Sequence, residues 1–292
     1  MTAATAVVGV VGIGRMGAAI AGRLHETHEV LGWDVRDVVD APIDMVATRE
    51  ELARRCDIIL LAMPSPRETR SLFDDSGFRS AFVAGDCVVC DMSTSDPASF
   101  RELAAGLGPA AERLLDAPVL GRPDRCGAWT IPLGGSVVHA ERAAGVLERL
   151  AARVEHVGEH GTAHTLKLLN NLMFAAINVV TAEAVAACDH LGLPPRRFVD
   201  LVAGSSAATV SQLFRDLAPR MIGDGGETVF TLDLLAKDLQ LAARMCEDAG
   251  AALVSARASQ IAVSGAVRAG FGGEDSASLV RWYRGRAAID AR

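Results

Sequence analysis

The sequence predicts a doubly wound, parallel α/β domain of the Rossmann type over residues 1–160, followed by an all-α domain over residues 161–292 that opens with a long interdomain helix. Three observations favour this fold class. Short apolar runs rich in β-branched residues alternate with segments of helical spacing as far as residue 158. After Gly161 the strand signals stop and helical patterns fill the rest of the chain. A length of 292 residues leaves room for about two domains.

The first domain is expected to contain short strands and amphipathic helices in regular alternation. Parallel strands buried on both faces show nearly continuous apolar runs, whereas the helices that connect them have a period of about 3.6 residues. Glycine or proline closes most of the apolar runs and marks the connections. The strands, with their following loops, are predicted at 6–14, 28–34, 57–66, 86–97, 113–121, 130–136 and 155–158, and the helices at 15–25, 49–56, 98–107 and 139–154.

The second domain begins with a helix expected over residues 162–190. Its apolar middle contains Lys167, Asn171 and Asn178, whose spacing places all three on one helical face. Because the other faces are apolar, this polar stripe must face a cleft or a polar partner. The functional interpretation is a partly desolvated lysine that gives and takes a proton beside an amide that orients the reacting oxygen. The alternative is a lysine that extends out of a domain interface.

Composition and motifs exclude several classes of protein. A net charge of −7 argues against binding of nucleic acid or an anionic membrane, so local cations or amides must hold any anionic substrate. Cys87 and Cys90 would point to opposite faces of a strand, which disfavours a metal or redox pair. The six cysteines are scattered along the chain and look like those of a reducing compartment. No run has the roughly 18 apolar residues of a membrane span, and the N-terminus lacks the basic region of a signal peptide. We expect a cytoplasmic protein, and no metal-binding motif is present.

The segment "GIGRMG" has glycines at 12, 14 and 17 in G-x-G-x-x-G register between a predicted strand and a predicted helix. Glycines in this setting allow a tight turn and the close approach of a pyrophosphate, which meets the helix N-terminus. An ordinary glycine-rich turn is the alternative. Asp34 closes the second strand, where it can accept from a ribose 2′-hydroxyl and repel a 2′-phosphate. This favours NAD, while Arg36 nearby leaves NADP open.

Five stretches of the chain resemble the β-hydroxyacid dehydrogenase family, which includes 3-hydroxyisobutyrate dehydrogenase and tartronate semialdehyde reductase and is related to 6-phosphogluconate dehydrogenase. They occur in the family's order and span nearly the whole chain. The stretches are "GVVGIGRMGAAIAGRL", "DMSTSDP", "DAPVLG", "GTAHTLKLLNNLMFAA" and "FTLDLLAKDLQLA".

The resemblance implies roles for individual residues. Lys167 looks like the catalytic lysine, a general acid towards a carbonyl oxygen in reduction and a base towards the alcohol in oxidation. Asn171 looks like the amide that binds substrate beside it, and Ser93 matches the loop that touches substrate. The cofactor side is implied to involve Gly12, Gly14, Arg15, Met16, Gly17, Asp34, Arg36, Met63, Pro64, Thr94 and Lys237, the last as a lysine that closes over the site.

The chain departs from the family where the substrate anion is held. The family usually continues "DAPV" with Ser-Gly-Gly, whereas this chain has Leu120, Gly121 and Arg122. A lost hydroxyl and a gained guanidinium alter an anion site, which suggests a small anionic substrate with a sulfonate, phosphonate, phosphate or second carboxylate, bound by Gly121, Arg122 and Ser93. The family's sulfolactaldehyde reductases are similar in having Gly-Arg here. The alternative is that Arg122 points to solvent or to Asp124.

The leading hypothesis is an NAD(P)-dependent reductase or dehydrogenase that interconverts a small β-hydroxy acid, or an alcohol with an anionic tail, and its aldehyde. The alternatives are an imine reductase of the same superfamily, which typically lacks the lysine, and a non-catalytic dinucleotide-binding protein. The apolar helical half and the resemblance indicate a homodimer or homotetramer. His164 and Trp129 are interpreted as packing residues.

Overall fold

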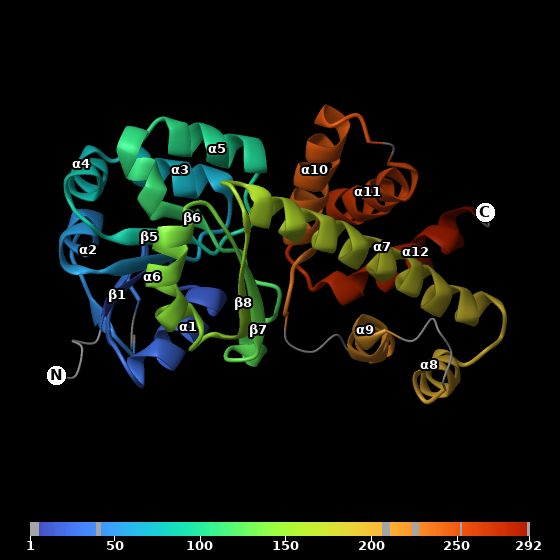
Figure 1. The fold of residues 1–292 in the computed structure, drawn as a ribbon. Coiled ribbons are helices and arrows are strands. Elements are labelled where there is room, and N and C mark those ends of the chain that lie inside the picture. The colour runs from blue at the N-terminus through green and yellow to red at the C-terminus, as the bar shows by residue number, and fades with distance from the viewer. Residues whose placement is uncertain (1–5, 39–41, 206–210, 224–227, 252, 291–292) are drawn as a thin grey trace. The chain divides into compact units, whose positions relative to one another are not determined.

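The computed structural model describes residues 6–38, 42–205, 211–223, 228–251 and 253–290 (Figure 1). The chain forms two compact units that meet inside one helix, between Lys167 and Leu168. The first is a Rossmann-type domain and the second is all-helical, so the predicted fold class is confirmed. The signal-peptide prediction rests partly on residues 1–5, which lie outside the described residues.

The first unit is built on one eight-stranded sheet with the order β3-β2-β1-β4-β5-β6-β7-β8. Neighbouring strands are parallel except for β6 and β7, which pair antiparallel at Asp116 and Gly134. The predicted parallel sheet is therefore confirmed, with one antiparallel pair of neighbours at this position. Parallel neighbours need a long crossover, whereas β6 returns to β7 through a loop with a single short 3₁₀ turn. The strands are β1 Val7–Val11, β2 Glu29–Trp33, β3 Asp44–Met45, β4 Ile58–Leu61, β5 Val88–Asp91, β6 Leu114–Asp116, β7 Trp129–Gly134 and β8 Ala151–Gly158.

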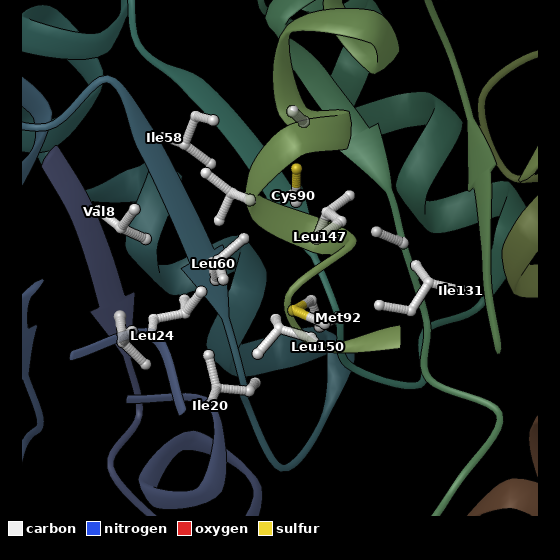
Figure 2. Packing of buried hydrophobic residues seen from close by; sticks show 14 of the residues in the cluster. Val8, Ile20, Leu24, Ile58, Leu60, Cys90, Met92, Ile131, Leu147 and Leu150 are labelled. Carbon is white, nitrogen blue, oxygen red and sulfur yellow. The ribbon is translucent and has the colours of Figure 1, made fainter. Parts of the chain in front are cut away.

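Helices cover both faces of this sheet. On one face α1 and α6 pack against Val8, Leu60 and Cys90 (Figure 2). On the other face α2, α3, α4 and α5 form a second apolar cluster. It contains Cys87 and the mutually packed rings of Phe73, Phe78 and Phe82. The two cysteines thus lie on opposite faces, as predicted. The helices are α1 Arg15–His25, α2 Arg49–Arg55, α3 Pro66–Asp74, α4 Ser76–Ala84, α5 Pro97–Ala105 and α6 Val137–Leu147, with 3₁₀ turns at Gly108–Arg113 and Pro123–Arg125.

Two local predictions differ from the structure. The helix expected over 139–154 ends at Leu147, because residues from Ala151 onward pair with β7 as strand β8. No helix was predicted at α3 and α4, whose first turns are capped by the side chains of Ser65 and Asp75. Strand pairing with β7 thus sets the end of the first helix, and capping by short polar side chains sets the starts of α3 and α4.

The second unit consists of helices around one apolar core. The buried face of α7 contributes Ala175, Val179 and Val185 to this core, and the helix matches the predicted range. An 18-residue window of α7 is apolar enough for a membrane span, but half of that window is buried within the protein, and a buried core helix meets the same criterion. The helices are α7 Thr162–His190, α8 Pro195–Ala203, α9 Gln212–Ile222, α10 Leu232–Asp248, α11 Val254–Ala266 and α12 Leu279–Asp290, with short helical turns at Val267–Phe271 and Ser276–Ser278.

Two glycines of α1 give opposite expectations for substitution by alanine. A Cβ at Gly17 would lie 1.8 Å from the Gly12 carbonyl oxygen, whereas one at exposed Gly22 would meet nothing within 4 Å. We expect Gly17→Ala to lower the free energy of unfolding by about 1–3 kcal/mol or more, because backbone atoms must move. Gly22→Ala is the matched control and should raise it by about 0.5–1 kcal/mol. Urea unfolding monitored by circular dichroism measures both, and equal midpoints for the two variants would contradict this packing.

Candidate active site

The turn between β1 and α1 is shaped to receive an anion. Gly12 has a φ of +89°, and a Cβ there would lie 2.6 Å from the Ala62 carbonyl oxygen. A Cβ at Gly14 would meet nothing within 4 Å, so the space beside this turn is open. No side chain caps the N-terminus of α1, and its first turn holds no acidic residue. Amide groups at such a helix start bind phosphate well, so this turn fits a dinucleotide's pyrophosphate.

Asp34 lies directly after β2 and is fixed by the glycine-rich turn. Its Oδ2 accepts from the Ile13 amide at 2.7 Å, and its Oδ1 accepts from the Arg36 amide at 2.9 Å. The Arg36 guanidinium adds contacts of 3.1 and 3.3 Å. Burial would raise the pKa of the Asp34 carboxyl, but the hydrogen bonds from Arg36 and Ile13 hold it below its usual value. Asp34 is therefore an ionised carboxylate at the carboxyl end of β2, able to accept a hydrogen bond from a hydroxyl group and already paired with Arg36.

The loops after β4 and β5 are tied together through Ser93. Its hydroxyl accepts from the Met63 amide at 2.9 Å, and its own amide donates to Asp91 at 2.9 Å. Pro64 and Thr94 follow in the same two loops. Because β1, β2, β4, β5 and β6 are parallel, their carboxyl ends share one edge of the sheet, where ligands bind in folds of this type.

The start of α7 is held by a buried carboxylate at the end of β6. Asp116 accepts from the amides of Gly161 and His164 at 2.9 and 3.1 Å, and its side chain is fully buried. A negative charge is favourable at a helix N-terminus, where amides lack partners within the helix. One turn further along, the half-buried Lys167 donates from Nζ to the Val119 carbonyl at 2.7 Å. This interaction places the ammonium group beside the segment that follows β6.

That segment, Val119–Arg122, is fixed from the other side by β7. Leu120 forms an antiparallel bridge with Thr130, and Gly121 packs so closely on Trp129 that a Cβ would lie 2.1 Å from the ring. The indole of Trp129 donates to the Arg122 carbonyl at 2.7 Å.

Trp129 is completely buried, in agreement with its interpretation as a packing residue. The Arg122 guanidinium lies 3.5 Å from Asp124, and about a third of its side chain is exposed. The ion pair with Asp124, which the sequence analysis left open, is therefore present. Its length indicates a weak contact, so an anionic ligand could compete with Asp124 for the Arg122 guanidinium.

In the second unit, Asn171 is held by an acid on α10. Its Nδ2 donates to Asp238 Oδ2 at 2.5 Å, and its Oδ1 accepts from Asn170 at 3.2 Å. Lys237 lies 3.1 Å from the other oxygen of Asp238. Asn178 is fully buried, without a hydrogen-bond partner among the described residues. Asn171 is four residues after Lys167 on the same helix, so both side chains lie on one side of α7.

Sequence reasoning missed one signal in its residue counts. Of the 29 lysine and arginine residues only Lys167 and Lys237 are lysines. Arginine stays protonated in proteins, whereas lysine can exchange its proton. Arginine occupies every other cationic position, so this composition singles out Lys167 and Lys237 as candidates for proton exchange. Among the described residues, no three metal-ligating side chains gather at one place.

Both halves of the chain match models of known protein families. A family model described as the NAD binding domain of 6-phosphogluconate dehydrogenase matches residues 7–158, and one described as NAD-binding of NADP-dependent 3-hydroxyisobutyrate dehydrogenase matches residues 161–283. The 3-sulfolactaldehyde reductase of Escherichia coli K12 is 28% identical over 98% of this chain and 99% of its own. The 3-hydroxyisobutyrate dehydrogenase of Pseudomonas aeruginosa is 27% identical over 94% and 97%. The crystal structure of 3-hydroxyisobutyrate dehydrogenase from Salmonella typhimurium superposes with a TM-score of 0.83 at 24% identity, over 94% and 99%.

Replacement of Asp116 by Asn should destabilise the protein. An amide can accept only through its oxygen, so one of the two amides at the start of α7 would face an NH₂ group instead. We expect a loss of about 2–3 kcal/mol in the free energy of unfolding, the scale of a hydrogen bond to a buried charge. Asp96→Asn is the matched control: Asp96 caps α5, where Asn serves as well as Asp, so we expect a change within about 0.5 kcal/mol. Urea midpoints that shift equally in both variants would argue against this anchor.

Proposed function

The chain belongs to the β-hydroxyacid dehydrogenase family, and we propose that it interconverts a small β-hydroxy acid, or an alcohol with an anionic tail, and the corresponding aldehyde. It is an NAD(P)-dependent oxidoreductase that acts on CH–OH groups. The observation that carries the specific proposal is the position of Lys167, half-buried at the start of α7 and hydrogen-bonded to the segment after β6.

The residues of the first unit fit the family's dinucleotide. Amides of Gly14, Arg15, Met16 and Gly17 would hold its pyrophosphate at the uncapped start of α1. The Gly12 amide already donates to the Trp33 carbonyl at 2.9 Å, so Gly12 would contribute the tight turn rather than a hydrogen bond. Met63, Pro64 and Thr94 would contact the nicotinamide end, as, by the family resemblance, would Lys237 of the second unit. When bound, the nicotinamide supplies or accepts the hydride. Asp34 supports NAD as the preferred form, because its carboxylate would accept from a ribose hydroxyl and repel a 2′-phosphate. Arg36 could leave Asp34 to bind that phosphate, so NADP is the second candidate.

The proton is assigned to Lys167. In reduction its ammonium group would release the Val119 carbonyl and donate to the substrate oxygen, and in oxidation the neutral amine would accept the proton back. Asn171 would orient the same oxygen, with its amide rotamer fixed by Asp238. Lys167 and Asn171, on successive turns of one helix, would thus both contact the oxygen that reacts.

The substrate tail is assigned to Ser93, Gly121 and Arg122. The Trp129 and Thr130 contacts hold the backbone of this segment in place, and the Arg122 guanidinium would supply the positive charge for an oxyanion. The 28% identity to a 3-sulfolactaldehyde reductase supports a sulfonate tail, while a carboxylate, phosphonate or phosphate is also an anionic oxygen acceptor for this segment. The Asp124 carboxylate competes for Arg122 and would have to be displaced.

Assembly and location follow from the same reasoning. Leu166, Leu169, Met173 and Val180 form an exposed apolar stripe along α7, and burial of such a stripe supports a homodimer or homotetramer. Net negative charge and the small-molecule chemistry support a cytoplasmic enzyme without nucleic-acid or membrane partners.

An imine reductase remains the second candidate, although the presence of Lys167 counts against it. A non-catalytic dinucleotide-binding protein would have no physical need for Lys167, Asn171 and Lys237 together.

Substitution of Lys167 tests the assigned proton transfer. Lys167→Met should lower kcat by about 10²- to 10⁴-fold, the usual contribution of general acid–base catalysis, with little change in NAD(P)H affinity. Lys167→Arg keeps the charge but cannot release a proton, so we expect it to be similarly slow. Steady-state kinetics and fluorescence titration with NAD(P)H measure the two quantities. Wild-type turnover in either variant would refute the role of Lys167.

Substitution of Arg122 tests the tail. If it binds a sulfonate, Arg122→Gly should lower kcat/KM for a sulfonate-tailed aldehyde by about 10- to 100-fold, the loss of a charged hydrogen bond. The carboxylate-tailed counterpart should change less. Arg125→Gly is the matched control, because Arg125 also contacts Asp124, at 3.8 Å, and is more exposed. A preference for carboxylate that neither variant alters would show that Arg122 does not contact the substrate tail.

A further inference from the structure

Two fully buried ionisable groups of the first unit have no part in the proposed reaction. The His164 ring, in the first turn of α7, lies with Nε2 3.5 Å from Asp91 Oδ2, at the end of β5. Both side chains are 0% exposed. Neither ring nitrogen makes a well-directed hydrogen bond to a described residue, and Phe100 covers the ring edge-on at 4.8 Å. A histidine used only to fill space would not need to stand beside a buried carboxylate.

Asp91 shapes the segment that carries Ser93. Its Oδ1 accepts from the Ser93 amide at 2.9 Å, and its Oδ2 accepts from the Ser95 hydroxyl at 3.1 Å. Burial would raise the pKa of the Asp91 carboxyl, but the contacts with His164 and Ser93 lower it below the usual value. Among the described residues, His164 is the one basic side chain within ion-pair distance of Asp91. The imidazole is therefore positioned to stabilise the carboxylate that organises this turn, together with the Ser93 amide and the Ser95 hydroxyl.

His164 is also bound to the frame of α7. Its amide donates to Asp116 at 3.1 Å, and it precedes Lys167 by three residues, less than one helical turn. The main chain of His164 thus joins β6 and Lys167, while its side chain reaches the loop after β5. One residue links the two segments that carry Ser93 and Lys167.

We propose that His164 is a positioning residue: by pairing with Asp91, its imidazole holds residues 91–95 against the first turn of α7 and so fixes Ser93 relative to Lys167. His164 itself touches neither substrate nor cofactor. The catalytic meaning of Ser93 and Lys167 rests on the proposed function, whereas the pairing and its effect on residues 91–95 do not. The competing explanation is that the imidazole only fills volume beneath Phe100.

Three variants separate pairing from packing. His164→Phe keeps an aromatic ring of similar size but removes both nitrogens. His164→Gln keeps an N–H donor that can reach Asp91, without an aromatic ring. Asp91→Asn removes the charge from the other side of the pair. If pairing matters, His164→Gln should behave like the wild type and His164→Phe should not; if packing matters, the order is reversed.

Amide hydrogen exchange of the cofactor-free protein is the readout that does not depend on catalysis. We expect His164→Phe and Asp91→Asn to raise exchange at residues 92–96 by about tenfold or more, because the turn loses its anchor. His164→Gln should stay within about threefold of the wild type, and β1 (Val7–Val11) serves as the internal control. Unchanged exchange at 92–96 in His164→Phe would overturn the proposal. If that variant does not fold, unchanged exchange in Asp91→Asn would do the same.

Kinetics give the second readout. His164→Phe should lose about 10- to 100-fold in kcat through misplacement of Ser93, with NAD(P)H affinity changed by less than about threefold. His164→Gln should recover most of kcat, and the double variant His164→Phe/Asp91→Asn should be no slower than the slower single variant. Multiplicative losses, or a Gln variant as impaired as Phe, would contradict positioning through Asp91. Lys167→Met tests the proposed function separately: normal turnover there with altered exchange in His164→Phe would overturn the reaction assignment and keep the pairing.

Discussion

The hydrogen bonds from the start of α7 to the Asp116 carboxylate are the constraint on which the site depends. β6 is the last strand that runs parallel to the nucleotide-binding half of the sheet, and Asp116 ends it. By accepting from Gly161 and His164, the carboxylate fixes the first turn of a 29-residue helix to that strand end. The helix then delivers Lys167 to Val119, in the same strand's continuation. Lys167 and the segment Val119–Arg122, to which we assign the proton and the substrate tail, are therefore both anchored to the end of one strand, which limits their relative movement.

The use of lysine and arginine agrees with this arrangement. Surface ion pairs throughout the chain, such as Arg54–Glu50 and Arg142–Asp86, are made by arginine. Lysine is kept for positions 167 and 237. Arginine binds carboxylates well through its planar fork, but only lysine can exchange a proton at ordinary pH. The restriction of lysine to these two positions is consistent with the proton transfer that we propose for Lys167.

The fold could be predicted from the sequence because its information is local. The strand periodicity, the glycine-rich turn and the uninterrupted helical pattern from 162 to 190 all depend on neighbours within a few residues. The direction of β7 depends on a loop connection, which periodicity does not reveal. The end of α6 depends on strand pairing, and the predicted helix was too long for that reason. Asn171 and Asp238 are 67 residues apart, and His164 and Asp91 are also remote in sequence, on separate elements. Periodicity cannot reveal such pairs, and His164 was accordingly interpreted as packing.

The most direct test of the central claim follows the hydride. The purified protein would be given NADH or NADPH deuterated at nicotinamide C4, with a three-carbon aldehyde that ends in carboxylate or sulfonate, and in parallel with a cyclic imine. We expect cofactor oxidation with at least one aldehyde, deuterium at the carbinol carbon of the hydroxy acid by mass spectrometry, and no reaction with the imine. Deuterium in an amine product, or no cofactor oxidation with either aldehyde, would contradict the assignment.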